Sequence, residues 1–154
     1  MKKFYFRLQK VLDVNEIREE NARRHFADAE RARGLQCDNL NAAESAVSSQ
    51  RVLFRDSLTK GIKAGDALVN HRFGQRLQRQ VGEEKRKLQH AEEVVSDRLK
   101  DLTEAARRKK MLEILKEKEI EKHRLEVTLA ESNEQDEVAG RRYTAALRMK
   151  EIDG

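Results

Sequence analysis

The sequence predicts an all-α fold, a long antiparallel two-helix coiled-coil hairpin in which the second helix is longer than the first. Charged residues make up 40% of the chain and aromatic residues 5%, with no proline or tryptophan, so material for a thick globular core is lacking. Apolar residues recur at seven-residue spacing on both sides of one break. The break contains Gly61 and Gly65, and each glycine lowers helix propensity by about 1 kcal/mol.

The first helix is expected over about residues 4–59. A seven-residue ladder has one column made of Phe26, Arg33, Leu40, Val47 and Phe54, and a second made of Ala29, Gln36, Ala43, Gln50 and Ser57. It extends backward through Leu12, Glu19 and Ala22. Six of the ten positions in the two columns are polar or small, so we expect a second helix, and a partner, to cover this weak seam.

The chain is expected to reverse over about residues 60–66. Asp66 follows the two glycines of the break, and its carboxylate can accept hydrogen bonds from the backbone amides that open a new helix. This segment therefore predicts a helix end, a turn and a helix start within a few residues.

The second helix is expected over about residues 67–150, with a kink near residues 74–82, where two glycines weaken the first turns. Its heptad positions are Val81, Leu88, Val95 and Leu102, and a second register follows through Met111, Leu115, Leu125, Leu129, Ala139 and Tyr143. The nine residues from Leu102 to Met111 do not fit one continuous heptad. We therefore expect the seam to rotate or loosen near residues 107–110.

The second helix is expected to overshoot the first. At about 1.5 Å per residue the first helix is about 80 Å long and the second about 125 Å, so roughly the last 20 to 30 residues have no partner within the chain. They still carry apolar side chains, namely Val138, Ala139, Tyr143, Ala146, Leu147 and Met149. An unpaired helix with an apolar stripe predicts a binding partner, and fraying is the alternative.

The loop end of the predicted hairpin is basic. Residues 51–90 hold ten Lys or Arg against four Asp or Glu, a net charge of +6. Within this segment Phe73 and Leu77 are one turn apart beside Arg72, Arg76 and Arg79, which predicts an apolar strip rimmed by positive charge. The alternatives are that both apolar residues merely close the hairpin and that the charge belongs to a solvated coiled-coil surface.

Motifs for catalysis or for metal binding are missing from the sequence. The histidines, His25, His71, His90 and His123, have no partners at metal-ligand spacing, and no phosphate-binding loop or GxSxG motif occurs. We expect no enzyme activity, cofactor or metal. The single Cys37, expected to be a buried small residue, is compatible with a reducing cytoplasm. Because no apolar run approaches about 20 residues, no membrane span is expected, and the protein is interpreted as cytosolic.

Residues at both ends resemble the family of the flagellar export protein FliJ. The first resemblance is the opening Phe6-Arg7-Leu8-Gln9-Lys10-Val11-Leu12-Asp13, followed by an Arg/Glu-rich helix. The second comprises Met111-Leu112-Glu113, Leu115-Lys116-Glu117-Lys118, Arg124-Leu125-Glu126, Glu134-Gln135-Asp136-Glu137-Val138-Ala139 and Arg141-Arg142-Tyr143. The similarity spans nearly the whole chain. Asn15 and Gln135 depart from the family pattern, where a basic and an apolar residue respectively are common.

The resemblance implies a stalk in the flagellar type III export apparatus, similar to the central stalk of rotary ATPases. Such a stalk inserts the end bearing both termini into the hexameric export ATPase, promotes ring assembly or activity, and contacts the cytoplasmic domain of the export gate. Export chaperones are further candidate partners. The implied location is cytoplasmic, peripheral to the inner membrane at the flagellar base, and any association with the membrane would run through partners.

Two sets of site residues follow from this resemblance and from the residue patterns above. The residues expected to bind the ATPase are Phe6, Arg7, Leu8, Gln9, Arg141, Arg142 and Tyr143. The residues expected to bind the gate are Phe73, Leu77, Arg72 and Arg76.

Two other functions fit the sequence. The basic loop end and an isoelectric point near 9.4 would suit a nucleic-acid-binding coiled-coil arm. Against it, Phe54 and Phe73 are the only aromatic residues available for base stacking in the basic segment, so no specific nucleic acid is expected. The equivalent stalk of a virulence type III secretion system is the second alternative.

Overall fold

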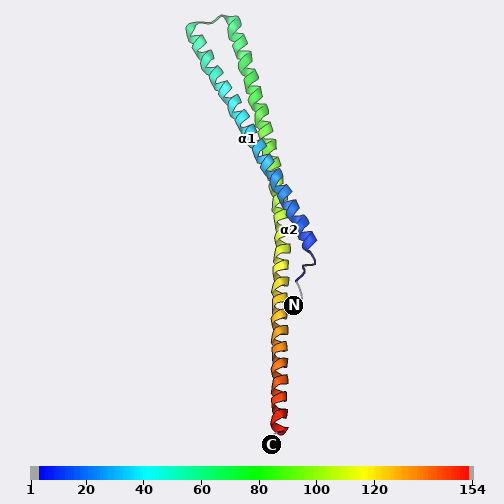
Figure 1. Ribbon diagram of the computed structural model, residues 1–154. Helices are drawn as coiled ribbons and strands as arrows, with labels where there is room; N and C mark the ends of the chain where they lie inside the picture. Colours follow the sequence, from blue (N-terminus) through cyan, green and yellow to red (C-terminus); the bar gives the residue numbers. More distant parts are fainter. Residues whose placement is uncertain (1–3, 153–154) are drawn as a thin grey trace. The chain divides into compact units, whose positions relative to one another are not determined.

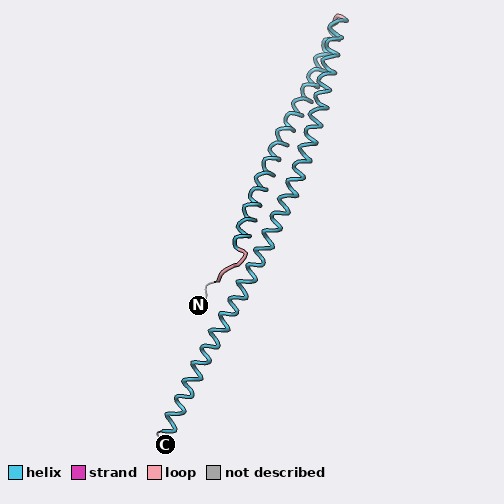
Figure 2. Tube along the Cα trace, turned by 90° about the vertical axis from the view of Figure 1, so that its right-hand side faces the viewer, coloured by secondary structure: helices cyan, strands magenta, loops and turns pink. Residues whose placement is uncertain are grey.

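The computed structural model describes residues 4–152, and it describes side chains for residues 4–144. It contains two helices, α1 (Gln9–Lys60) and α2 (Ala64–Ile152), of 52 and 89 residues (Figure 1). Helix and loop make up all of the described chain, without a strand (Figure 2). The prediction of an all-α, two-helix hairpin with a longer second helix is confirmed. The side chains of Ala146, Leu147 and Met149 lie outside the described residues.

Helix α1 begins at Gln9, five residues later than expected. The Gln9 amide donates to the carbonyl of Phe6 at 3.1 Å, and the amides of Val11 and Leu12 both donate to the carbonyl of Leu8 at 3.0 Å. These bonds satisfy backbone donors that have no partner inside a first helical turn. Residues 4–8 therefore form a short extension instead of another turn of helix.

The reversal occupies only Gly61, Ile62 and Lys63. Gly61 has φ +84°, a conformation that costs other residues roughly 1–2 kcal/mol, and its amide donates to the carbonyl of Leu58 at 3.3 Å. Asp66 lies inside the first turn of α2 and not ahead of it. Its negative charge is still favourable there, because unpaired amides make a helix N-terminus electropositive.

Helix α2 continues through Gly74 and Gly82, so the kink expected near residues 74–82 does not interrupt it. A Cβ atom on Gly74 would lie 3.1 Å from Oε1 of Gln50, whereas nothing lies within 4 Å of a Cβ atom on Gly82. Gln50 in turn donates from Nε2 to the carbonyl of Asn70 at 3.1 Å. The lack of a Cβ atom at Gly74 therefore leaves room for the side chain of Gln50 on α1, which hydrogen-bonds to the backbone of α2.

The chain forms two units, which are described separately. The middle unit comprises residues 17–106, and the terminal unit comprises residues 4–16 with residues 107–152. In the middle unit the predicted ladder is buried or half-buried at Glu19, Ala22, Phe26, Ala29, Gln36, Leu40, Ala43, Val47, Gln50, Phe54 and Ser57. Arg33 is the exception: it is exposed, and its guanidinium forms an ion pair with the Glu30 carboxylate at 2.9 Å.

The covered face of α2 keeps heptad spacing as far as Lys116, beyond which Ile120 and Val127 each lie one position off that spacing. In the middle unit it includes Leu77, Val81, Glu84, Leu88, Ala91, Val95, Leu102 and Ala105, and in the terminal unit Lys109, Leu112, Lys116, Ile120, His123 and Val127. The expected change of register near residues 107–110 is therefore wrong. Lys109 and Lys116 occupy heptad positions, where the apolar stems of lysine can be covered while the charged heads reach water.

Met111, Leu115, Leu125 and Leu129, which were expected to form a second seam, are exposed instead. About 100° separates successive residues of an α-helix, so these four lie on the side of α2 opposite Lys109, Lys116 and His123. The terminal unit thus carries two faces with apolar character, of which the N-terminal segment covers one.

Candidate interaction surfaces

The N-terminal segment anchors the terminal unit through aromatic residues. Phe6 is 3% exposed, and the ring of Phe4 lies 5.6 Å from that of His123, tilted by 45°. Farther along, Leu12 and Asn15 are buried, and Asn15 donates from Nδ2 to the carbonyl of Val11 at 2.8 Å. This bond satisfies a polar group that would otherwise be costly to bury. Covering of α2 is therefore established as far as His123.

Beyond Val127, α2 has an uncovered stretch, residues 128–144, which we call the overhang. Every residue in it is exposed, including Tyr143 at 68%. Arg141 is held by Glu137 at 2.8 Å, one turn earlier on the same exposed surface. The overhang thus presents aromatic, aliphatic and charged groups to other molecules.

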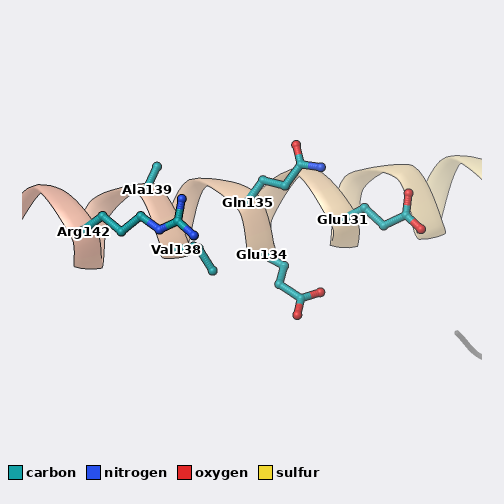
Figure 3. Close-up of a pocket in the computed structure, with 6 residues that line it drawn as sticks. All are labelled: Glu131, Glu134, Gln135, Val138, Ala139 and Arg142. Carbon is teal, nitrogen blue, oxygen red and sulfur yellow. The ribbon is translucent and has the colours of Figure 1, made fainter.

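The overhang includes one shallow depression, lined by Glu131, Glu134, Gln135, Val138, Ala139 and Arg142. Figure 3 shows that all six side chains project from a single stretch of α2. Because one helix cannot enclose a small molecule, this depression is a surface feature that suits a protein partner better than a bound metabolite.

The residues expected to bind the ATPase fall into two groups in the structure. Phe6 is buried and Leu8 and Gln9 are half-buried, so they support the terminal unit, with Gln9 donating from Nε2 to Asp13 Oδ1 at 2.7 Å. Arg7 is exposed beside them. Arg141, Arg142 and Tyr143 are also exposed, but they lie on the overhang, about 27 Å along the helix from His123.

The residues expected to bind the gate also separate. Arg72, Arg76 and Phe73 are exposed, whereas Leu77 is half-buried in the hairpin seam. The exposed apolar neighbour of Phe73 is Val69, one turn earlier, which the sequence interpretation missed. Leu77 lies one turn before the heptad residue Val81, which places it in the seam. The sequence spacing alone could therefore have predicted that Leu77 is partly buried.

The seam of the middle unit contains a polar cluster around the buried Glu84. Its carboxylate accepts from Nζ of Lys87 at 2.8 Å and from Nε2 of Gln36 on α1. The hydrogen bond from Lys87, followed by the one from Gln36, holds the pKa of Glu84 below its usual value of 4.5. The same carboxylate raises the pKa of Lys87. Glu84 thus links the two helices as a carboxylate.

The basic character of residues 51–90 is partly neutralised within the chain. Lys60 lies 2.6 Å from Asp56, Lys85 lies 3.2 Å from Glu44, and Lys87 pairs with Glu84. Arg72 and Arg76 are exposed on α2 near its start. Arg72 and Arg76 flank Phe73 in the sequence, where their positive charge can guide an acidic protein surface.

No cluster of three or more metal-ligating side chains occurs within residues 4–144. Cys37 is exposed, contrary to the expectation of a buried residue, because it lies one position beyond the seam residue Gln36. In the described part of the chain, neither helix has an apolar stretch long enough to cross a membrane. The features left for function are the overhang and the exposed surface at the loop end.

Comparison with known proteins identifies the family of this chain. The model of the family described as flagellar FliJ protein matches residues 3–148, nearly the whole chain. The chain belongs to the FliJ family. FliJ membership supports a role as a stalk component of type III secretion. A separate comparison with curated proteins finds no significant match.

A solved structure shares the FliJ-like fold seen here. It is a YscO homologue, CT670, from Chlamydia trachomatis, with a TM-score of 0.54 and 19% sequence identity. The likeness covers 95% of this chain and 99% of that one. At this identity the likeness establishes a shared fold.

Proposed function

We propose that this FliJ-family chain is the stalk of a flagellar type III export apparatus, inserting its overhang into the hexameric export ATPase. There it promotes assembly or activity of the ring, and its loop end links the ring to the cytoplasmic domain of the export gate. Export chaperones remain candidate partners. The role is non-enzymatic, and the protein acts in the cytoplasm, peripheral to the inner membrane at the flagellar base.

One observation carries this proposal: α2 continues as helix beyond Val127 although every side chain of the overhang is exposed. Helices derive most of their stability from tertiary packing, so a long uncovered helix that keeps apolar groups is built for a partner. A ring with a central opening is a partner that can surround such a helix on all sides. Family membership supports the proposal that this ring is the export ATPase.

The chemistry of the overhang suits the inner wall of a ring. Arg142 offers five donors in a planar fork to carboxylates or backbone carbonyls, and Tyr143 offers an apolar ring with a polar tip. The chain would contribute binding energy and no catalytic group, by preferring the assembled or active state. A hundredfold preference for that state would shift the equilibrium by about 2.7 kcal/mol.

At the loop end, the proposed gate surface is Phe73 with Val69, flanked by Arg72 and Arg76. An exposed aromatic residue bordered by arginines is a common arrangement at the centre of a protein interface. Leu77 belongs to the same proposal as a supporting residue, because its seam position holds the helix that presents Phe73. The flagellar apparatus is preferred to a virulence system because the matching family is the flagellar one.

Truncation after Ala130 tests the role of the overhang. Because residues 131–144 of the removed segment are uncovered, the truncated chain should keep its melting temperature by circular dichroism and should lose stimulation of the purified ATPase. Arg142→Glu in the full chain should raise the half-maximal stimulating concentration about tenfold, or about 1.4 kcal/mol, and less so at high salt.

The matched control is Arg124→Glu, an exposed arginine of α2 that lies before the overhang. This variant should stimulate the ATPase like the unmodified chain. If the chain truncated after Ala130 still stimulates fully at equal concentration, the overhang is not the coupling element and the proposal fails.

A further inference from the structure

An exposed seam runs along the uncovered side of α2 in the terminal unit. Its alternating three- and four-residue steps comprise Met111, Leu115, Lys118, Lys122, Leu125, Leu129, Ser132, Asp136, Ala139 and Tyr143, which we call the outer seam. All ten residues are exposed, with Leu125 at 61% and Leu129 at 63%. This spacing is that of one helix of a coiled coil.

Charges are distributed unevenly along the outer seam. Lys118 and Lys122 lie in its first half, and Asp136 lies in its second half. In a parallel pair of copies, each lysine would face the same lysine and Asp136 would face Asp136, which is unfavourable in a seam. In an antiparallel pair, the basic half of one copy meets the acidic half of the other.

Antiparallel pairing also matches the apolar residues. When Leu125 is set opposite Leu129 of the second copy, Lys118 falls opposite its Asp136. In the same register Met111 meets Tyr143 and Leu115 meets Ala139. We call each such pair of facing residues a layer. Every layer joins two apolar residues or two opposite charges except that of Lys122 and Ser132. The same five layers recur by two-fold symmetry, as an interface between identical chains requires.

We infer that the outer seam is an interface for a second copy of this chain, which forms an antiparallel homodimer through the terminal units. The leucine, methionine and tyrosine layers supply the apolar burial. The Lys118–Asp136 layers set orientation and register, because a slipped or parallel pairing leaves both charges without partners. Dimerisation is expected to be reversible, because four of the ten layers are polar.

The dimer would cover Ala139 and Tyr143 on the overhang. It would therefore compete with insertion into the ATPase, and the protein could be held as a dimer until a ring is available. This consequence rests on the proposed function, whereas the dimer itself does not. Loss of dimerisation and loss of ATPase stimulation are measured in separate assays, so the two proposals can fail independently.

Charge exchange in the full chain tests the interface. Sedimentation velocity across a range of concentrations should show a monomer–dimer equilibrium. Lys118→Glu and Asp136→Lys, each alone, should weaken dimerisation at least tenfold, and the double variant should restore it, because the opposite charges face each other again. Both positions are exposed, so circular dichroism should show unchanged helix content. A monomer at every concentration, or a double variant no better than the singles, overturns the proposal.

Cross-linking tests the orientation. In a Cys37→Ser background, chains carrying Leu125→Cys are mixed with chains carrying Leu129→Cys and are mildly oxidised. The antiparallel register places these two positions opposite each other, so the mixed disulfide should form faster than either self-linked product. Preferential linking of Leu125→Cys chains to one another would indicate parallel pairing and would overturn the proposal.

Discussion

Glu84 shows how a single polar residue can be used in a coiled-coil seam. It occupies a heptad position that an aliphatic residue would normally fill, yet it is buried with Gln36 and Lys87 as hydrogen-bond donors. Each donor satisfies a carboxylate oxygen, so the charge can stay in the seam. The lowered pKa of Glu84 follows from these two hydrogen bonds.

Stability at acidic pH should depend on Glu84. Because its folded-state pKa lies below the unfolded value near 4.5, its contribution is present above that value and is lost as the pH falls through the folded pKa. Glu84→Gln should reduce the difference in melting temperature between pH 7 and pH 3, measured by circular dichroism. Glu83→Gln, at the exposed neighbouring position, should leave this difference nearly unchanged.

Phe73 and Leu77 should separate stability from binding. Leu77→Ala removes a half-buried seam residue and should cost about 1–2 kcal/mol, or a few degrees in melting temperature. Phe73→Ala removes an exposed ring, so the melting temperature should change little while affinity for the gate domain falls at least tenfold in titration calorimetry. Equal effects of both substitutions on stability would place Phe73 in the seam and remove it from the gate surface.

At the scale of helices, two glycines illustrate opposite roles. Gly61 ends α1 at φ +84°, which a residue with a Cβ atom adopts only with strain. Gly82 lies in the interior of α2 with open space around it. The first glycine is required by the turn, and the second lowers helix propensity without a visible packing reason.

Alanine substitutions should therefore act in opposite directions. Gly61→Ala should destabilise the hairpin by about 1 kcal/mol or more, and Gly82→Ala should stabilise it by about 1 kcal/mol, in thermal unfolding followed by circular dichroism. Gly74→Ala serves as an intermediate case, because its Cβ would require Gln50 to move. A neutral Gly61→Ala would show that the turn relaxes to another conformation.

For the molecule as a whole, the competing functions predict different partners. The basic segment 51–90 would favour nucleic acid by counterion release, but part of its charge is paired within the chain. A pull-down from bacterial extract should retain the hexameric ATPase after nuclease treatment. Parallel purification of the chain truncated after Ala130 should lose the ATPase. Disappearance of the bound material on nuclease treatment would favour the nucleic-acid arm.

The exposure of candidate site residues was predictable where a single feature of the sequence determines it. The overhang follows from the different helix lengths on either side of the break, so the exposure of Arg142 and Tyr143 agrees with the expectation. The roles of Phe6 and Leu77 could not be separated from those of exposed residues in the same way. Whether Phe6 and Leu77 are buried depends on which side of the chain its neighbouring helix covers. An apolar side chain is compatible with a buried position and with an exposed binding position.

The sequence by itself determined the helical class, the position of the break and the seven-residue seam from Ala22 to Ser57. These properties depend on local propensity and on spacing within a single helix, which the chain carries directly. Only the tertiary structure decided which side of α2 in the terminal unit is covered. Met111 and Leu125 look more like core residues than Lys109 and Lys116 do. The two lysines nevertheless continue the heptad of Leu102 and Ala105, so they lie on the covered face. A continuous helix cannot rotate one part against the next.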